Sequence, residues 1–199
     1  GAIVILGVTP DRPETGYGYI KASSAADGTG VERFVEKPDL ATAQRYLAEG
    51  RYFWNSGMFV VRASVWLAAI ERCRADIAAA TRAAWLARSL DAAFVRPGRE
   101  AFAAIPSESI DYAVMEPIAA EPGAFSLRMV PLAAGWNDLG AWEAVWQVSS
   151  KDAAGNASHG DTILEGCEGS LLYGGERMVA GVGLKDIIET GDQPTGYGS

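Results

Sequence analysis

Residues 31–61 contain the pattern that most restricts how this chain can fold. Residues 31–35 alternate polar and apolar side chains and predict a strand, whereas Met58 begins an apolar run that predicts a buried strand. Between them, Asp39 is placed as the N-cap of a helix that ends at Gly50. Strand, helix and strand in this order are typical of a βαβ unit, and therefore of a mixed or parallel sheet.

The neighbouring segments extend this prediction to an α/β fold with a mixed sheet flanked by helices. The apolar run at residues 2–8 predicts a central strand covered on both faces, and residues 125–132 predict another strand. The alanine-rich residues 65–90 predict one long helix with Ser64 as its N-cap.

Two further features concern the boundaries of elements and domains. Residues 108–115 predict a helix that is capped by Ser107 and stopped by Pro117. From Gly155 the composition changes to short apolar segments divided by glycine, which predicts short strands. We therefore expect a first domain over residues 1–154, the start of a β-rich C-terminal region over 155–193, and a disordered tail over 194–199.

Composition excludes several classes of protein. A net charge of −8 argues against nucleic-acid binding, which needs a basic face, and no apolar run of membrane-spanning length is present. Cys73 and Cys167 lack metal-ligand spacing and predict a reducing, cytoplasmic setting, although one disulfide between them stays open.

Asn55, Ser56 and Gly57 lie just before the apolar run that Met58 begins. An amide has donors and acceptors enough to hold vicinal hydroxyls of a sugar, and a glycine lets a ring approach the backbone. The alternative is a turn with an Asx hydrogen bond. Gly16, Tyr17 and Gly18 form a glycine loop that can likewise approach a ligand, or an ordinary hairpin turn.

Charged side chains follow two of the predicted strands. Glu36 can accept hydrogen bonds from hydroxyls, and Lys37 can neutralise a phosphate. The alternative is that the two form an exposed ion pair that contributes little stability. Asp138 follows the strand at 125–132 and suits Mg²⁺, which prefers oxygen donors, or it caps the next helix. Asp111 belongs to the predicted helix at 108–115, where we expect it on the surface rather than in a site.

Together, five segments resemble those of bacterial mannose-1-phosphate guanylyltransferases, which are sugar-nucleotide pyrophosphorylases with a Rossmann-like nucleotidyltransferase fold. The segments stand in the family's order, at residues 14–20, 34–38, 53–59, 106–116 and 135–140. The resemblance covers about residues 2–190.

The resemblance implies a role for each matching residue. The sugar pocket would be lined by Gly16, Tyr17 and Gly18, and Gly57 would allow the sugar to approach the backbone closely. The mannose hydroxyls would be bound by Glu36 and Asn55, and the sugar phosphate by Lys37. Asp138 would be one of two aspartates on Mg²⁺. Lys37 and Asp138 would be the catalytic groups. The implied reaction is attack by a mannose 1-phosphate oxygen on the α-phosphate of GTP, which gives GDP-mannose and pyrophosphate.

One departure from the family pattern shapes what we expect of this chain. The family opens with a Gly-Gly-x-Gly-x-Arg-Leu loop for the nucleotide phosphates, and neither this loop nor the Gly-Asp that follows it occurs here. We therefore expect the chain to supply the sugar-phosphate half of the enzyme and to be inactive alone. The alternatives are a non-catalytic sugar-phosphate-binding or regulatory module and a purely structural α/β domain, and homo-oligomerisation is left open.

Overall fold

The computed structural model describes residues 1–23, 29–121, 123 and 125–191, so the predicted tail at 194–199 lies outside the described residues. The chain forms two compact units, which divide between Trp136 and Asn137, earlier than residue 154, while the domain boundary expected there stays a prediction. One reason for the earlier division is that Trp146 belongs to the second unit, where its Nε1 donates to the carbonyl of Gly155 at 3.1 Å.

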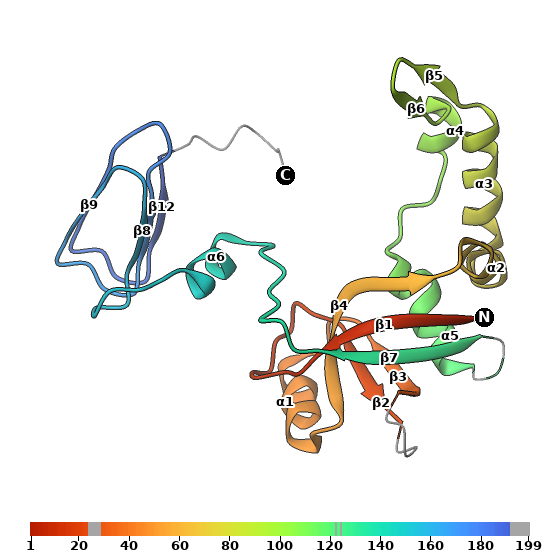
Figure 1. The fold of residues 1–199 in the computed structure, drawn as a ribbon, viewed down its shortest axis with the longest axis horizontal. Helices are drawn as coiled ribbons and strands as arrows, with labels where there is room; N and C mark the ends of the chain where they lie inside the picture. Colours follow the sequence, from red (N-terminus) through yellow and green to blue (C-terminus); the bar gives the residue numbers. More distant parts are fainter. Residues whose placement is uncertain (24–28, 122, 124, 192–199) are drawn as a thin grey trace. The chain divides into compact units, whose positions relative to one another are not determined.

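The first unit is built on a five-stranded mixed sheet (Figure 1). Its strands lie in the order β3 (Val31–Val35), β2 (Tyr19–Ala22), β4 (Tyr52–Val61), β1 (Ala2–Val8) and β7 (Ser126–Leu132). β1 runs antiparallel to β4 and parallel to β7, which confirms the predicted mixed sheet. β2 pairs antiparallel with both β3 and β4, so the βαβ unit at residues 31–61 is real but has β2 inserted between its two strands.

The helix of that unit, α1 (Leu40–Glu49), begins and ends as its sequence predicts. The Asp39 carboxylate accepts from the Thr42 amide at 2.7 Å, and Gly50 adopts the left-handed conformation at φ 69° that ends many helices. α1 packs on β2 and β4 through an aromatic cluster, in which the Tyr46 and Tyr52 rings stack at 3.8 Å between centroids. This cluster supports the part of β4 from which the site is built.

The opposite face of the sheet carries the main core. It is covered by α2 (Ala63–Cys73), the π-helix η1 (Asp111–Met115) and α5 (Glu116–Ala120). The largest fully buried apolar side chains of this core are Ile3, Ile5, Ile20, Val114, Met115 and Met129.

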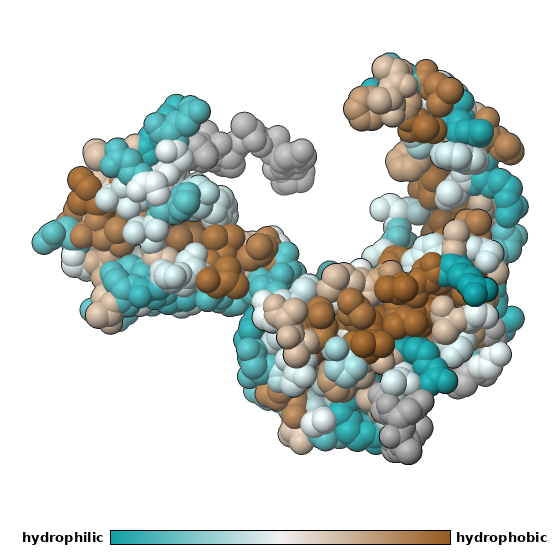
Figure 2. Space-filling view, in the orientation of Figure 1, coloured by the Kyte–Doolittle hydropathy of each residue, from teal (hydrophilic) through white to brown (hydrophobic). Residues whose placement is uncertain are grey.

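Part of the sheet is left uncovered, contrary to the prediction that β1 is covered on both faces. Val4 and Leu6 of β1 are only partly buried, Val60 of β4 is 63% exposed, and Val130 of β7 is 44% exposed. The strand register places Val4 beside Val60, and Leu6 beside Val130. Figure 2 shows hydrophobic residues gathered over this part of the first unit.

The predicted long helix at 65–90 is wrong in both its start and its continuity. α2 begins at Ala63 with Arg62, not Ser64, as its N-cap, and Arg74 interrupts the helix before α3 (Ala75–Leu86). Arg74 leaves the helical conformation at φ −144° and ψ 71°, and its guanidinium donates to Asp76 in the first turn of α3 and pairs with Glu108. A hairpin of β5 (Ser89–Asp91) and β6 (Phe94–Arg96) and the short α4 (Arg99–Ala103) follow.

The helix predicted at 108–115 also differs in its form. A π-helix spans Asp111–Met115 with Ile110, not Ser107, before it, and Pro117 does not stop it but lies at the start of α5. Proline lacks an N–H and clashes with the carbonyl four residues earlier, so it cannot continue an α-helical ladder. The wider turn, in which the Glu116 amide donates to the Asp111 carbonyl, accommodates Pro117 without a break.

The second unit contains α6 (Trp142–Val148) and the predicted short strands, arranged as coils of parallel strands. β8 (Ala157–His159), β10 (Leu171–Tyr173) and β12 (Ile188–Thr190) form one sheet, and β9 (Thr162–Glu165) and β11 (Val179–Val182) form another. The side chain of Asn156 is buried within this unit, where its Nδ2 donates to Cys167 O and its Oδ1 accepts from the Ser170 amide. Among the described residues, no helix has the length and hydropathy to cross a bilayer.

Candidate functional site

Asn55 lies in the middle of β4 rather than before it, where the pairing with β1 shifts register between Ile5 and Gly7. Such bulges bend a strand and redirect its side chains. Gly57 supplies the positive φ of 72°, and its amide donates to Asn55 Oδ1 at 3.0 Å. The Asx hydrogen bond, which is the alternative considered from the sequence, is therefore present. It uses one of the two acceptor lone pairs of the Asn55 side-chain amide.

The backbone N–H of Asn55 donates to Gly18 O at 2.7 Å, which brings the glycine loop beside the bulge. A Cβ on Gly18 would clash with Glu36 Oε2 and lie 3.2 Å from Asn55 Cβ. Gly18, Glu36 and Asn55 therefore meet at one place, as the sugar-pocket hypothesis requires. Glycine is needed here because the protein itself approaches closely; neither Gly16 nor Gly18 has a positive φ, and the loop is not a hairpin, since β1 and β2 do not pair.

Glu36 is the buried acid of this cluster. Its side chain is 9% exposed, and Oε2 has no hydrogen-bond partner among the residues that the structure describes. Burying a carboxylate oxygen without a hydrogen-bond partner costs folding free energy, so such an oxygen calls for an explanation. Because its lone pairs are unused, Glu36 Oε2 can accept a hydrogen bond from a ligand hydroxyl.

Lys37 follows Glu36 and reaches toward solvent. Its Nζ lies 3.7 Å from Glu36 Oε1, and its side chain is 57% exposed. The backbone of Lys37 has a φ of 46°, an unusual conformation for a residue that precedes proline, and its amide donates to Tyr17 O at 3.2 Å. The strand end and the glycine loop are thus joined at Lys37, which sets a cation beside the buried acid.

Two carboxylates that we did not assign to the site complete it. Asn55 Nδ2 donates to Asp111 Oδ1 at 3.0 Å, and the Glu36 amide donates to Glu116 Oε1 at 2.8 Å. The prediction that Asp111 lies on the surface is wrong, because the π-helix turns it inward. Its apolar neighbours Ala113 and Val114, both buried, are the sequence signal that could have indicated this.

The clustering of these acids changes their acidity. Burial, followed by the nearby Asp111 carboxylate, raises the pKa of Glu36 above its ordinary value, against the lowering effect of Lys37. Burial likewise raises the pKa of Asp111, and the hydrogen bond from Asn55 opposes the rise. A buried and a half-buried acid with raised pKa values beside one lysine are typical of a functional site.

The remaining glycine-loop residues form the border of the cluster. The Tyr17 ring packs edge-on against Trp54 at 5.3 Å and against Trp136 at 5.4 Å between centroids. Gly16 is exposed, and its amide donates to Glu14 Oε1 at 3.0 Å. Tyr17 therefore offers an apolar wall near the cluster, whereas Gly16 lies against Glu14 rather than against Glu36 or Asn55.

Asp138 belongs to the second unit rather than to the unit that carries this cluster. Its side chain is exposed, and Ala141, not Asp138, is the N-cap of α6, so the capping alternative is wrong. In the part of the chain that the structure describes, no three His, Cys, Asp or Glu side chains gather as a metal site. Asp138 alone offers one carboxylate to a divalent cation, which is an oxygen donor of the kind Mg²⁺ prefers.

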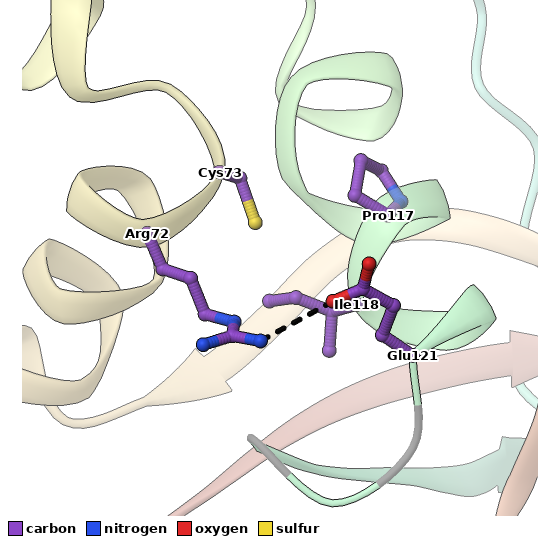
Figure 3. Close-up of a pocket in the computed structure, with 5 residues that line it drawn as sticks. All are labelled: Arg72, Cys73, Pro117, Ile118 and Glu121. Atoms are coloured by element: carbon purple, nitrogen blue, oxygen red, sulfur yellow. Dashed lines mark hydrogen bonds and ion pairs between the residues drawn. The ribbon is translucent and has the colours of Figure 1, made fainter.

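A separate cavity of about 310 Å³ lies between α2 and α5 (Figure 3). Arg72 Nη2 donates to Glu121 Oε2 at 3.2 Å beside it, and Cys73, Pro117 and Ile118 complete the lining. Burial raises the pKa of the Cys73 thiol, which makes it a poor nucleophile near neutral pH. None of the residues that the sequence assigned to the site lines this cavity.

The family model described as nucleotidyl transferase matches residues 1–155. The chain belongs to the nucleotidyl transferase family. This match includes every residue of the Gly18, Glu36, Asn55 cluster as well as Asp138. It confirms the family and the α/β fold that the five segments predicted.

Among curated proteins, the chain is 50% identical to the xanthan biosynthesis protein XanB of Xanthomonas campestris pv. campestris strain B100, with 96% of the chain and 40% of XanB covered. It is 44% identical to the mannose-1-phosphate guanylyltransferase of Escherichia coli K12, with 94% of this chain and 39% of that enzyme covered. The chain thus spans about two fifths of the length of these relatives.

A solved structure from Thermus thermophilus, described as a mannose-1-phosphate geranyltransferase, matches with a TM-score of 0.78 at 30% identity. The match covers 98% of this chain and 54% of that one. Because nearly the whole chain is covered, the nucleotidyl transferase sheet and the coils of parallel strands occur together in a known structure.

Proposed function

We propose that this chain holds the sugar phosphate in the transfer of GMP from GTP to mannose 1-phosphate, which gives GDP-mannose and pyrophosphate. The observation that carries the proposal is the convergence of Gly18, Glu36 and Asn55 on one place, with Lys37 at its edge. The relatives named for this reaction or for polysaccharide synthesis support the choice of substrate.

The chemistry of the cluster suits a sugar phosphate. After its bonds to Asp111 and Gly57, the Asn55 amide keeps one N–H and one acceptor lone pair, and Glu36 Oε2 keeps its acceptor capacity. A sugar hydroxyl can both donate and accept a hydrogen bond, so hydroxyls can donate to Glu36 Oε2 and to the Asn55 oxygen and can accept from the remaining Asn55 N–H. Lys37 then supplies a positive charge for the phosphate, in a chain whose net charge is −8.

In this proposal, residues of the chain align the sugar phosphate and balance its charge. Glu36 and Asn55 fix the ring, so that the phosphate oxygen that attacks the α-phosphate of GTP is held in one orientation. Lys37 lowers the repulsion between the two anionic reactants. From the second unit, Asp138 would offer one carboxylate to Mg²⁺, an ion that would supply charge neutralisation to phosphates.

Two broader features of the proposal concern the setting. Cys73 and Cys167 are both free, which supports the cytoplasmic location predicted from the sequence. The uncovered apolar residues of β1, β4 and β7 support self-association of the chain.

The proposal is tested by calorimetric titration of the chain with mannose 1-phosphate and with free mannose. We expect Lys37→Ala to weaken binding of mannose 1-phosphate more than of mannose, because only the first ligand carries the phosphate. Asn55→Ala should weaken both ligands about equally, by about 1–3 kcal/mol. Equal losses for both ligands in Lys37→Ala would show that Lys37 does not bind the phosphate.

A further inference from the structure

Asp111 and Glu116 reach the site through the π-helix. They are the first and last residues of a turn closed by the bond from the Glu116 amide to the Asp111 carbonyl. In an α-helix, five residues turn through about 500°, so the two side chains would point about 140° apart. The wider π-turn brings both round to one side of the helix.

On that side, each carboxylate holds one residue of the candidate sugar pocket. Asp111 Oδ1 accepts from Asn55 Nδ2 at 3.0 Å, while Gly57 N donates to Asn55 Oδ1 at 3.0 Å. Since a carboxylate requires a donor and an N–H requires an acceptor, only one of the two amide orientations satisfies both bonds. Glu116 Oε1 accepts from the backbone amide of Glu36 at 2.8 Å, at the end of β3.

We propose that Asp111 is a positioning residue of the sugar pocket, which fixes the side-chain amide of Asn55 so that one defined N–H and one defined lone pair face the ligand. Glu116 has the corresponding role for Glu36, which it holds through the backbone amide. The inference rests on the proposed function for the identity of the ligand. Pro117 has a part in it, because it excludes a continuous α-helix at this point.

The surroundings of Asp111 agree with a functional placement. Glu36, Glu116 and Lys37 are the charged groups that act on it, together with the Asn55 amide. Burial of one carboxylate beside two others is unfavourable for folding alone. The arrangement is therefore better explained by what it does for Asn55 and Glu36 than by a gain in stability.

The first test needs no ligand. The Asn55 side-chain NH₂ signals are followed by ¹⁵N NMR, with Asn55→Asp used for their assignment. Asp111→Ala should shift these signals and speed exchange of their protons with water, whereas Asp111→Asn, which keeps an acceptor oxygen, should restore them. Glu121→Ala, which removes an exposed carboxylate just after α5, is the matched control and should leave them unchanged. If Asp111→Ala folds poorly, Asp111→Ser, which is too short to reach Asn55, takes its place.

The second test measures affinity in the same variants. Asp111→Ala should weaken mannose and mannose 1-phosphate alike, by about tenfold or more, and Asp111→Asn should bind within about threefold of the wild type. Unchanged Asn55 signals in Asp111→Ala and in Asp111→Ser, or unchanged affinity, would overturn the positioning role. Shifted Asn55 signals in a chain whose wild type binds neither ligand would support the positioning of Asn55 and overturn the proposed function instead.

Discussion

Gly18→Ala tests whether the close approach of the glycine loop to Glu36 and Asn55 is required. The added Cβ would clash with Glu36 Oε2 and lie 3.2 Å from Asn55 Cβ. Glu36 Oε2 ends a flexible side chain, but that side chain is only 9% exposed and has little room to withdraw, and the backbone N–H of Asn55 is bonded to Gly18 O. The new methyl group must therefore displace one of the two side chains.

The expected size of the effect follows from two opposing terms. Overpacking of a buried position costs about 1–3 kcal/mol. Replacing glycine by alanine restores about 0.4–1 kcal/mol, because the unfolded chain loses conformational freedom, and no positive φ adds strain at Gly18. We expect a net loss of unfolding free energy on the order of 1–2 kcal/mol.

The assay is urea unfolding followed by tryptophan fluorescence, with Gly16→Ala as the matched control. Gly16 belongs to the same loop but is exposed, and its added Cβ would meet only the Glu14 carboxylate, at 3.3 Å. A Cβ contact with one flexible side chain is readily relieved, so Gly16→Ala should unfold close to the wild type. If Gly18→Ala were as stable as Gly16→Ala and bound mannose 1-phosphate as tightly, the packed contact between loop, Glu36 and Asn55 would be refuted.

Three further predictions concern the acids, the second unit and the uncovered face. Glu36 and Asp111 have raised pKa values in the folded chain, so their stabilising contribution is complete below their unfolded pKa values near 4 and is lost as pH rises through the folded values. Urea unfolding from pH 4 to pH 8 should therefore show a smaller loss of stability in Asp111→Asn than in the wild type, and identical slopes would contradict this. Leu172→Ala, at a fully buried position, should destabilise the second unit by about 2–5 kcal/mol and leave hydrogen exchange in β1 unchanged, whereas Val182→Ala, at a position 72% exposed, should do little. Val60→Lys should reduce self-association in sedimentation velocity, and a wild type that stays monomeric at high concentration would contradict the role of the apolar face.

Local signals in the sequence predicted the parts of the fold that depend on local chemistry. Asp39 and Gly50 define α1 because capping and a left-handed end are properties of single residues. The break at Arg74 was not predicted, because its ion pair with Glu108 joins residues that are far apart in the sequence.

The candidate site was predicted in part for the same reason. Glu36, Lys37 and Asn55 follow or interrupt strands, and strand pairing brings them together. Asp111 could not be placed correctly, because a helix with 3.6 residues per turn is the ordinary expectation, whereas the structure has a π-turn just before Pro117. The role of Asp138 as a Mg²⁺ ligand stays a prediction, since Asp138 lies in the second compact unit and not in the unit that carries Glu36 and Asn55.

The most direct test of the sugar-phosphate site is a crystal structure of the chain soaked with mannose 1-phosphate. We expect sugar hydroxyls within hydrogen-bond distance of Glu36 Oε2 and the Asn55 side chain, and a phosphate oxygen beside Lys37 Nζ. A sugar phosphate bound elsewhere, or bound with its phosphate directed away from Lys37, would contradict this expectation.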